Sequence, residues 1–135
     1  MDDPRKAIRL IASTAVATVL AFTAGCASLL GNGEGEALYA DHCAGCHGHA
    51  GRGDGPIAPR LGRPPSDLRR LARDNGGSFP ETLVYQVVEG QRLVDGHGTR
   101  DMPVWGRVFA RDGGEAAATT RIDALIHHLE RIQLR

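Results

Sequence analysis

The sequence predicts a small all-α domain of about four short helices. Two segments place apolar residues at helical spacing, and no run typical of a β-strand precedes the single close pair of cysteines. The 135 residues suffice for one domain. Because 18 glycines and 7 prolines make the middle of the chain rich in loops, we expect a small apolar core that needs a cross-link or a bound group.

The first and last helices are expected at the two ends of this domain. The first covers Glu36–His42 and offers Leu38 and Tyr39 for burial. The last follows Gly113-Gly114, and its apolar residues form one stripe. The pair His127-His128 lies beside that stripe, where we expect a surface role. The stripe consists of Ile122, Leu125, Ile126, Leu129 and Ile132.

Two further helices are expected in the middle of the chain. A short one follows Pro64-Pro65-Ser66-Asp67 and continues through about Arg73. Ser78-Phe79-Pro80-Glu81 has the form of a capping box, with Pro80 in the first turn. The helix after it is expected to run to about Glu89, with four apolar residues on one face. These four are Leu83, Val84, Val87 and Val88.

An export signal is expected over residues 1–25. Basic residues precede an uncharged, largely apolar run from Leu10 to Ala24, and small residues follow it. The end of this run, Phe22-Thr23-Ala24-Gly25-Cys26, resembles a bacterial lipobox, although Thr23 replaces the usual leucine. The resemblance implies that Cys26 carries a lipid in the mature protein.

The segment after the signal is expected to be a tether. Residues 26–35 hold the lipidated cysteine and a glycine-rich stretch, and the domain proper is expected over 36–135. An uncleaved membrane helix over Leu10–Leu30 and plain cleavage remain alternatives. In each case the basic residues stay in the cytoplasm, so the domain is expected on the periplasmic side of a bacterial membrane.

The charge balance argues against a nucleic-acid partner. The formal net charge is zero, and from Cys26 onward 13 arginines face 14 acidic residues. A protein that binds nucleic acid is expected to show a basic excess.

The cysteine pair Cys43 and Cys46 carries the strongest signal in the chain. A zinc site would need two more suitably spaced ligands, and a thioredoxin-like pair would follow a strand. The chain offers neither feature, whereas His47 follows the second cysteine directly. Cys43-Ala44-Gly45-Cys46-His47 is the attachment signature of c-type haem. On a helical turn, two thiols at this spacing can reach two neighbouring vinyl groups, with the imidazole beneath the iron.

From about residue 35 to its end, the chain resembles small monohaem class I cytochromes c. The resemblance implies one haem c, bound through two thioethers, with His47 as one iron ligand. It also implies that the first and last helices cross, with Leu38 and Tyr39 against the apolar stripe.

The second iron ligand is expected to be Met102. Gln91–Phe109 is expected to be the ligand loop, and Asp101-Met102-Pro103 in it resembles the family's Met-Pro motif. A thioether is a soft neutral ligand that raises the reduction potential. A core gap-filling role for Met102 and ligation by His97 are the alternatives.

Further haem contacts follow from the same resemblance. Pro59, twelve residues after His47, is expected to accept the imidazole Nδ1–H through its carbonyl, and Leu61 to pack on the ring. Trp105 is expected to pack at the haem edge and to offer its indole N–H to a propionate. Arg100 or Arg107 could neutralise a propionate.

These features predict a one-electron carrier rather than an enzyme. Ligands on both haem faces leave no place for substrate. The expected partners are redox proteins of the periplasm or membrane: a quinol-oxidising complex, a dehydrogenase or a terminal oxidase. One alternative is a subunit through which electrons enter a specific oxidoreductase complex. A haem sensor or small peroxidase is the other, and it would require Met102 to dissociate.

Overall fold

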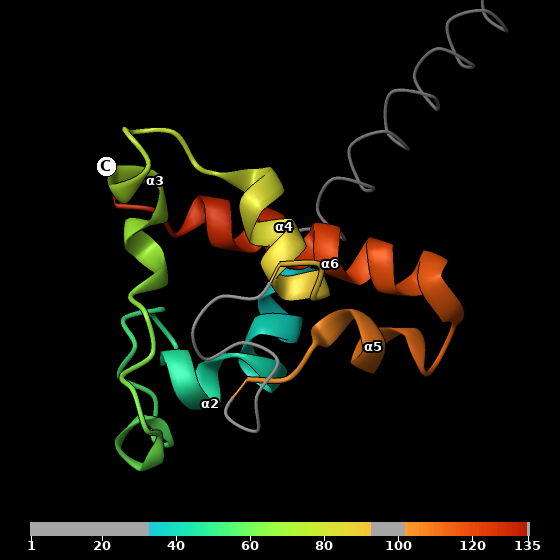
Figure 1. Cartoon of the computed structure of the whole chain (residues 1–135), viewed down its shortest axis with the longest axis horizontal. Coiled ribbons are helices and arrows are strands. Elements are labelled where there is room, and N and C mark those ends of the chain that lie inside the picture. The colour runs from blue at the N-terminus through green and yellow to red at the C-terminus, as the bar shows by residue number, and fades with distance from the viewer. Residues whose placement is uncertain (1–32, 93–101, 135) are drawn as a thin grey trace, which may run out of the picture. The chain divides into compact units, whose positions relative to one another are not determined.

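The computed structural model describes residues 33–92 and 102–134. The chain divides into two units, Met1–Gly31 and Asn32–Arg135, and all described residues belong to the second. These residues form helices and loops without an extended strand, so the predicted all-α class is confirmed (Figure 1). The expectations for the export signal, for Cys26 and for His97 and Arg100 concern residues outside this description. Within the described residues, no helix is long and apolar enough to span a membrane.

Most of the described helices are short. A helix over residues 33–42 leads through Cys43 directly into the next one. The later elements are α2 (Ala44–His47), the 3-10 turns η1 (Ala58–Arg60) and η2 (Leu68–Arg70), α3 (Leu71–Asp74), α4 (Glu81–Glu89), α5 (Trp105–Ala110) and α6 (Gly114–Arg131).

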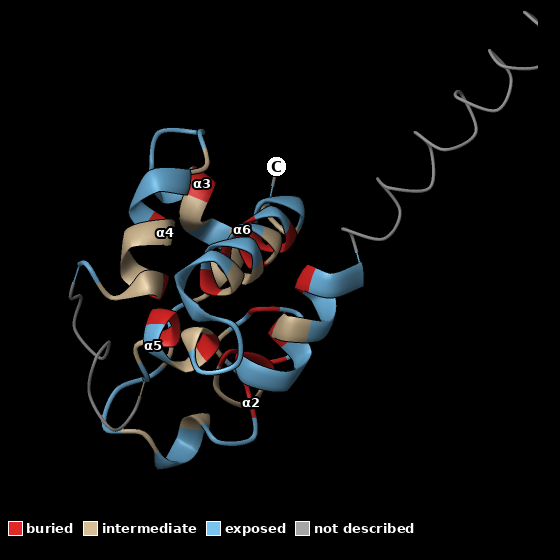
Figure 2. Cartoon of the chain, turned by 90° about the vertical axis from the view of Figure 1, so that its right-hand side faces the viewer, coloured by how far each residue is buried: buried red, intermediate tan, exposed pale blue. Residues whose placement is uncertain are grey.

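The last helix, α6, supplies most of the core. It is buried on one side and exposed on the other (Figure 2), as the apolar stripe predicts. Ile122 and Leu125 are only 0% and 1% exposed, and Ile126 and Leu129 are also buried. Tyr39 on the helix over 33–42 packs in the same cluster, which confirms the expected contact between the first and last helices.

Two expectations about these helices are wrong. Residues 33–35, expected in the tether, are helical, and Gly35 is buried where this helix meets α6. A Cβ at Gly35 would overlap the carbonyl oxygen of Ala124, so glycine permits the close approach. His128, expected at the surface, is buried, and its ring centroid lies 4.9 Å from that of Tyr39. His127 is exposed, as expected.

The helix boundaries also differ from expectation at two places. α4 has no side-chain cap, and Pro80 rather than Ser78 is its N-cap, so the capping box does not form. α5 lies inside the expected ligand loop. It buries Trp105 and Phe109 on one side, with their ring centroids 5.6 Å apart. Six residues are too few for helical periodicity to stand out in the sequence.

Candidate cofactor pocket

The cysteine pair sits on one helical turn. The backbone N–H groups of Cys46 and His47 both donate to the carbonyl of Cys43, at 3.1 and 2.9 Å. The turn therefore has the local geometry that the attachment signature predicts. Both thiols are free, but Cys43 is buried whereas Cys46 is half-buried. Burial, together with the neighbouring Cys46, raises the pKa of the Cys43 thiol to about 12.

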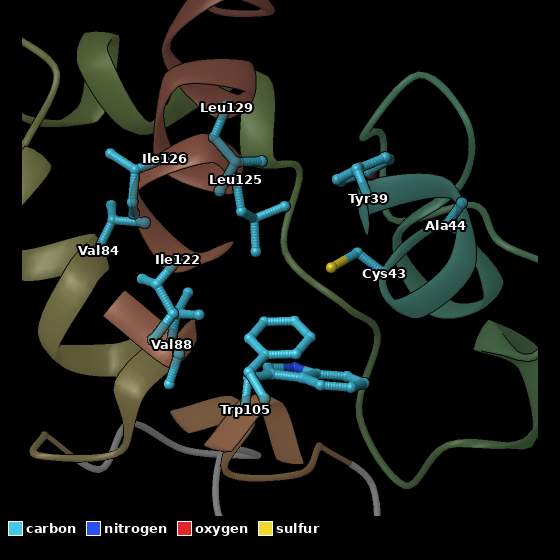
Figure 3. Packing of buried hydrophobic residues seen from close by; sticks show 12 residues of the cluster. Tyr39, Cys43, Ala44, Val84, Val88, Trp105, Ile122, Leu125, Ile126 and Leu129 are labelled. Carbon is cyan, nitrogen blue, oxygen red and sulfur yellow. The ribbon is translucent and has the colours of Figure 1, made fainter. Parts of the chain in front are cut away.

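A cavity of about 420 Å³ lies between α2, α4, α5 and α6. Its volume is in the range of pockets that hold small molecules and cofactors. In Figure 3 the sulfur of Cys43 points away from its own helix toward Leu125, with Trp105 below. The lining side chains are mostly apolar. They include Cys43, His47, Met102, Trp105, Leu125 and Leu129, together with all four apolar residues of the expected α4 face.

The orientation of His47 is fixed by a backbone carbonyl. Its Nδ1 lies 3.1 Å from the carbonyl oxygen of Ser66. Because a carbonyl can only accept, Nδ1 carries the hydrogen and the lone pair of Nε2 is free to bind iron. Burial lowers the pKa of His47, which keeps the ring neutral, as iron ligation requires.

The prediction that Pro59 and Leu61 are the partners of His47 is wrong. Pro59 is exposed in η1, and neither Pro59 nor Leu61 lines the cavity. Ser66 provides the carbonyl, and Leu68 lines the cavity. The spacing of two residues between carbonyl and leucine is kept, but the pair lies seven residues further along the chain. Part of the intervening segment lies against the attachment turn, where the N–H of Ile57 donates to the carbonyl of Gly45.

Contacts on both sides of Ser66 hold its segment in place. A Cβ at Gly53 would overlap the carbonyl oxygen of Pro65, so the glycine-rich loop presses directly on this segment. Gln133, just beyond α6, donates to the Leu68 carbonyl at 2.8 Å and accepts from the Ala72 N–H at 2.8 Å. The contribution of Gln133 was not predicted, because no sequence pattern links residues so far apart.

Trp105 lines the cavity and carries a buried polar atom without a partner. The residue is 9% exposed, and its Nε1 has no hydrogen-bond acceptor among the described residues. A haem propionate would supply the missing acceptor, as expected from the sequence. Arg107 is exposed and does not line the cavity, whereas Arg63, which sequence reasoning missed, does.

The residues present fit a covalently bound haem. Cys43 and His47 on the attachment turn line one apolar cavity together with Met102, which comes from a segment far along the chain. Trp105, whose buried Nε1 lacks an acceptor among the described residues, also lines it. An all-α fold with this attachment turn and pocket defines a c-type cytochrome domain of class I.

Comparison with known families agrees with this class. The chain belongs to the family described as cytochrome c oxidase, cbb3-type, subunit III, whose model matches residues 32–121. This membership implies covalently bound haem c and haem-mediated electron transfer. The comparisons with curated proteins and with solved structures found no match.

Proposed function

We propose that the protein is a one-electron carrier with a single haem c. Thioethers to Cys43 and Cys46 attach the haem, and His47 and Met102 ligate the iron. One observation carries this proposal: His47 and Met102 line the same cavity as the buried thiol of Cys43. When bound, the haem supplies reversible one-electron chemistry, and the protein controls its potential and access.

The side chains around the pocket suit electron transfer better than catalysis. Met102 provides a neutral thioether, which favours the reduced state. The hydrogen bond between His47 and Ser66 fixes the imidazole and makes it a better donor. The leucines and valines of α4 and α6 line the rest of the cavity and disfavour water there. If His47 and Met102 both held the iron, no iron position would be left for a substrate.

The proposed setting is the periplasmic face of a bacterial membrane. A lipid on Cys26, or a retained N-terminal helix, would hold the domain near membrane redox proteins. Such tethering raises the effective concentration of the carrier at its partners. Candidate partners are a quinol-oxidising complex, a dehydrogenase and a terminal oxidase.

A second candidate function is a subunit through which electrons enter a terminal oxidase. The family's description, which names a subunit of cytochrome c oxidase, favours this candidate. A dedicated subunit should purify with its oxidase through a salt wash, whereas a free carrier should separate from it.

An optical spectrum of the holoprotein, with and without carbon monoxide, tests the His47/Met102 assignment. We expect a low-spin haem with the methionine–iron charge-transfer band and no response to the gas. Met102→Ala should open the site and bind carbon monoxide. Val87→Ala, which also alters the cavity lining, should not. Gas binding by the unmodified protein would contradict the carrier function and favour a sensor or peroxidase.

A further inference from the structure

The side chain of Gln133 ties the end of α6 to the segment that follows Ser66. Its Nε2 donates to the Leu68 carbonyl at 2.8 Å and to the Leu129 carbonyl at 2.7 Å, and its Oε1 accepts from the Ala72 N–H at 2.8 Å. Leu129 belongs to α6, whereas the other two partners belong to η2 and α3. In Figure 1 the end of α6 reaches the region of α3. One side chain thus links segments that are 61 and 65 residues apart in the sequence.

The three backbone partners of Gln133 require a carboxamide in one orientation. The carbonyls of Leu68 and Leu129 can only accept, whereas the N–H of Ala72 can only donate. The position therefore needs two donors and one acceptor on a single planar group. Leu129 lies in the last turn of α6, where carbonyls lack a partner within the helix, so the same amide also caps α6.

The segment that Gln133 fixes carries the hydrogen bond of His47. Leu68 is held at both of its backbone groups, because its N–H donates to the Gly51 carbonyl at 2.7 Å and its carbonyl accepts from Gln133. Ser66, whose carbonyl oxygen lies 3.1 Å from the Nδ1 of His47, comes only two residues earlier. A displacement of Leu68 would therefore be passed to Ser66 through one intervening residue.

The side chain of Gln133 also connects two parts of the pocket lining. Leu68 lines the cavity, and so does Leu129 of α6. A separate backbone contact holds the end of the chain, because the N–H of Leu134 donates to the Arg69 carbonyl at 2.8 Å. Loss of the Gln133 side chain alone should therefore leave the end of the chain docked and loosen the segment before Arg69.

We propose that Gln133 is a positioning residue for His47 and that it thereby lowers the reduction potential of the haem. This inference rests on the proposed function, in which His47 ligates the iron. A firm hydrogen bond from Nδ1–H to the Ser66 carbonyl makes the imidazole a better donor, which favours the ferric state. Gln133 does not itself line the cavity, so it acts through this hydrogen bond.

The reduction potential of holoprotein variants tests this role. Gln133→Met keeps a side chain of similar length and no charge, but it offers no N–H donor. We expect its potential, measured by spectroelectrochemistry, to rise. Asn75→Leu is the matched control, because it removes another side-chain amide, whose Nδ2 donates to the Ser78 carbonyl at 2.9 Å. The potential of this control should equal that of the wild type.

Proton NMR of the reduced holoprotein adds a measurement at His47 itself. Exchange of its Nδ1–H with deuterated solvent should be about fivefold faster or more in Gln133→Met, the effect of losing a typical hydrogen bond. Asn75→Leu should exchange at the wild-type rate. Gln133→Asn keeps the amide on a shorter side chain, so it should change both readings in the same direction and by less. This variant also serves if Gln133→Met yields no holoprotein.

Two results would overturn the proposal. In the first, Gln133→Met loses stability to denaturant but keeps the wild-type potential and exchange rate, so that its role is only structural. In the second, Asn75→Leu shifts both readings as much as Gln133→Met does. Carbon monoxide binding by the unmodified holoprotein would instead contradict the proposed function. The comparison of variants would remain valid in that case, because it requires only that His47 holds the iron.

Discussion

His128 places a titratable ring in the contact between α6 and the helix over 33–42. It is buried against Tyr39, and neither ring nitrogen has a hydrogen-bond partner among the described residues. Burial lowers the pKa of His128 below its usual value of 6.5, Arg131 lowers it further, and Glu36 opposes them. The unfolded chain therefore binds a proton more readily than the folded one.

Acid should destabilise the domain through this residue. The contribution of neutral His128 is fully present above pH 6.5, and it is lost as the pH falls below that value. We expect His128→Leu to be progressively more stable than the wild type as the pH is lowered from about 8 to about 5. Thermal unfolding followed by circular dichroism measures this. His127→Leu, at the exposed neighbouring position, should show no such trend; an identical trend would refute the explanation.

The residues of the pocket show which contacts sequence can predict. Cys43, Cys46 and His47 form a contiguous signature, and Met102 occurs next to a proline in a recognisable motif. Ser66 could not be chosen over Pro59, because two similar carbonyl–leucine pairs follow the attachment turn and only packing selects one. Arg63 was missed because no sequence pattern indicates that the segment before Ser66 reaches the cavity.

At the scale of elements, one glycine sets the distance between two helices. Gly35 lets the helix over 33–42 approach the backbone of α6 at Ala124. Apolar periodicity predicted α6 and the inner face of α4, because their stripes are long enough to recognise. The close crossing of these two helices depends on the absence of a side chain at Gly35. The spacing of apolar residues does not predict such a contact.

Gly35→Ala should therefore separate the two helices. We expect a loss of about 1–3 kcal/mol of unfolding free energy, typical of overpacking, measured by denaturant titration. Gly33→Ala lies on the same helix with no atom within 4 Å of the added Cβ. That substitution should be neutral or stabilise by up to roughly 1 kcal/mol through helix propensity. If both variants lost the same stability, the close approach would not be the cause.

A second prediction at this scale concerns Gly53, in the glycine-rich loop that packs against the segment of Ser66. Gly53 has a φ of +82°, and a Cβ there would overlap the carbonyl of Pro65. Gly53→Ala should displace Ser66 from His47 and leave the imidazole a poorer donor. We expect the reduction potential of the holoprotein to rise, measured by spectroelectrochemistry. Gly62→Ala, which meets nothing within 4 Å, should leave the potential unchanged; a matching shift there would argue against the role of Ser66.

At the scale of the whole molecule, the core and the pocket share the same side chains. Val84, Val88, Leu125 and Leu129 belong to the buried cluster and also line the 420 Å³ cavity. Burial of these side chains against a bound group would add to the apolar contacts of the core. The bound group is therefore part of the core.

A protein that cannot attach haem should consequently fail to fold cooperatively. Cys43→Ala combined with Cys46→Ala, purified free of haem, should lack the near-ultraviolet circular dichroism of fixed aromatic side chains. It should also show no sharp thermal transition. The holoprotein serves as the control and should show both signals. A cooperative transition in the variant would mean that the remaining side chains close the cavity by themselves.

The burial of Cys43 sets an order of events in biogenesis. In the folded domain its sulfur faces the interior and the residue is only 9% exposed, so it is less accessible to an attachment enzyme than Cys46. We therefore expect haem attachment to precede the closure of the helices around Cys43.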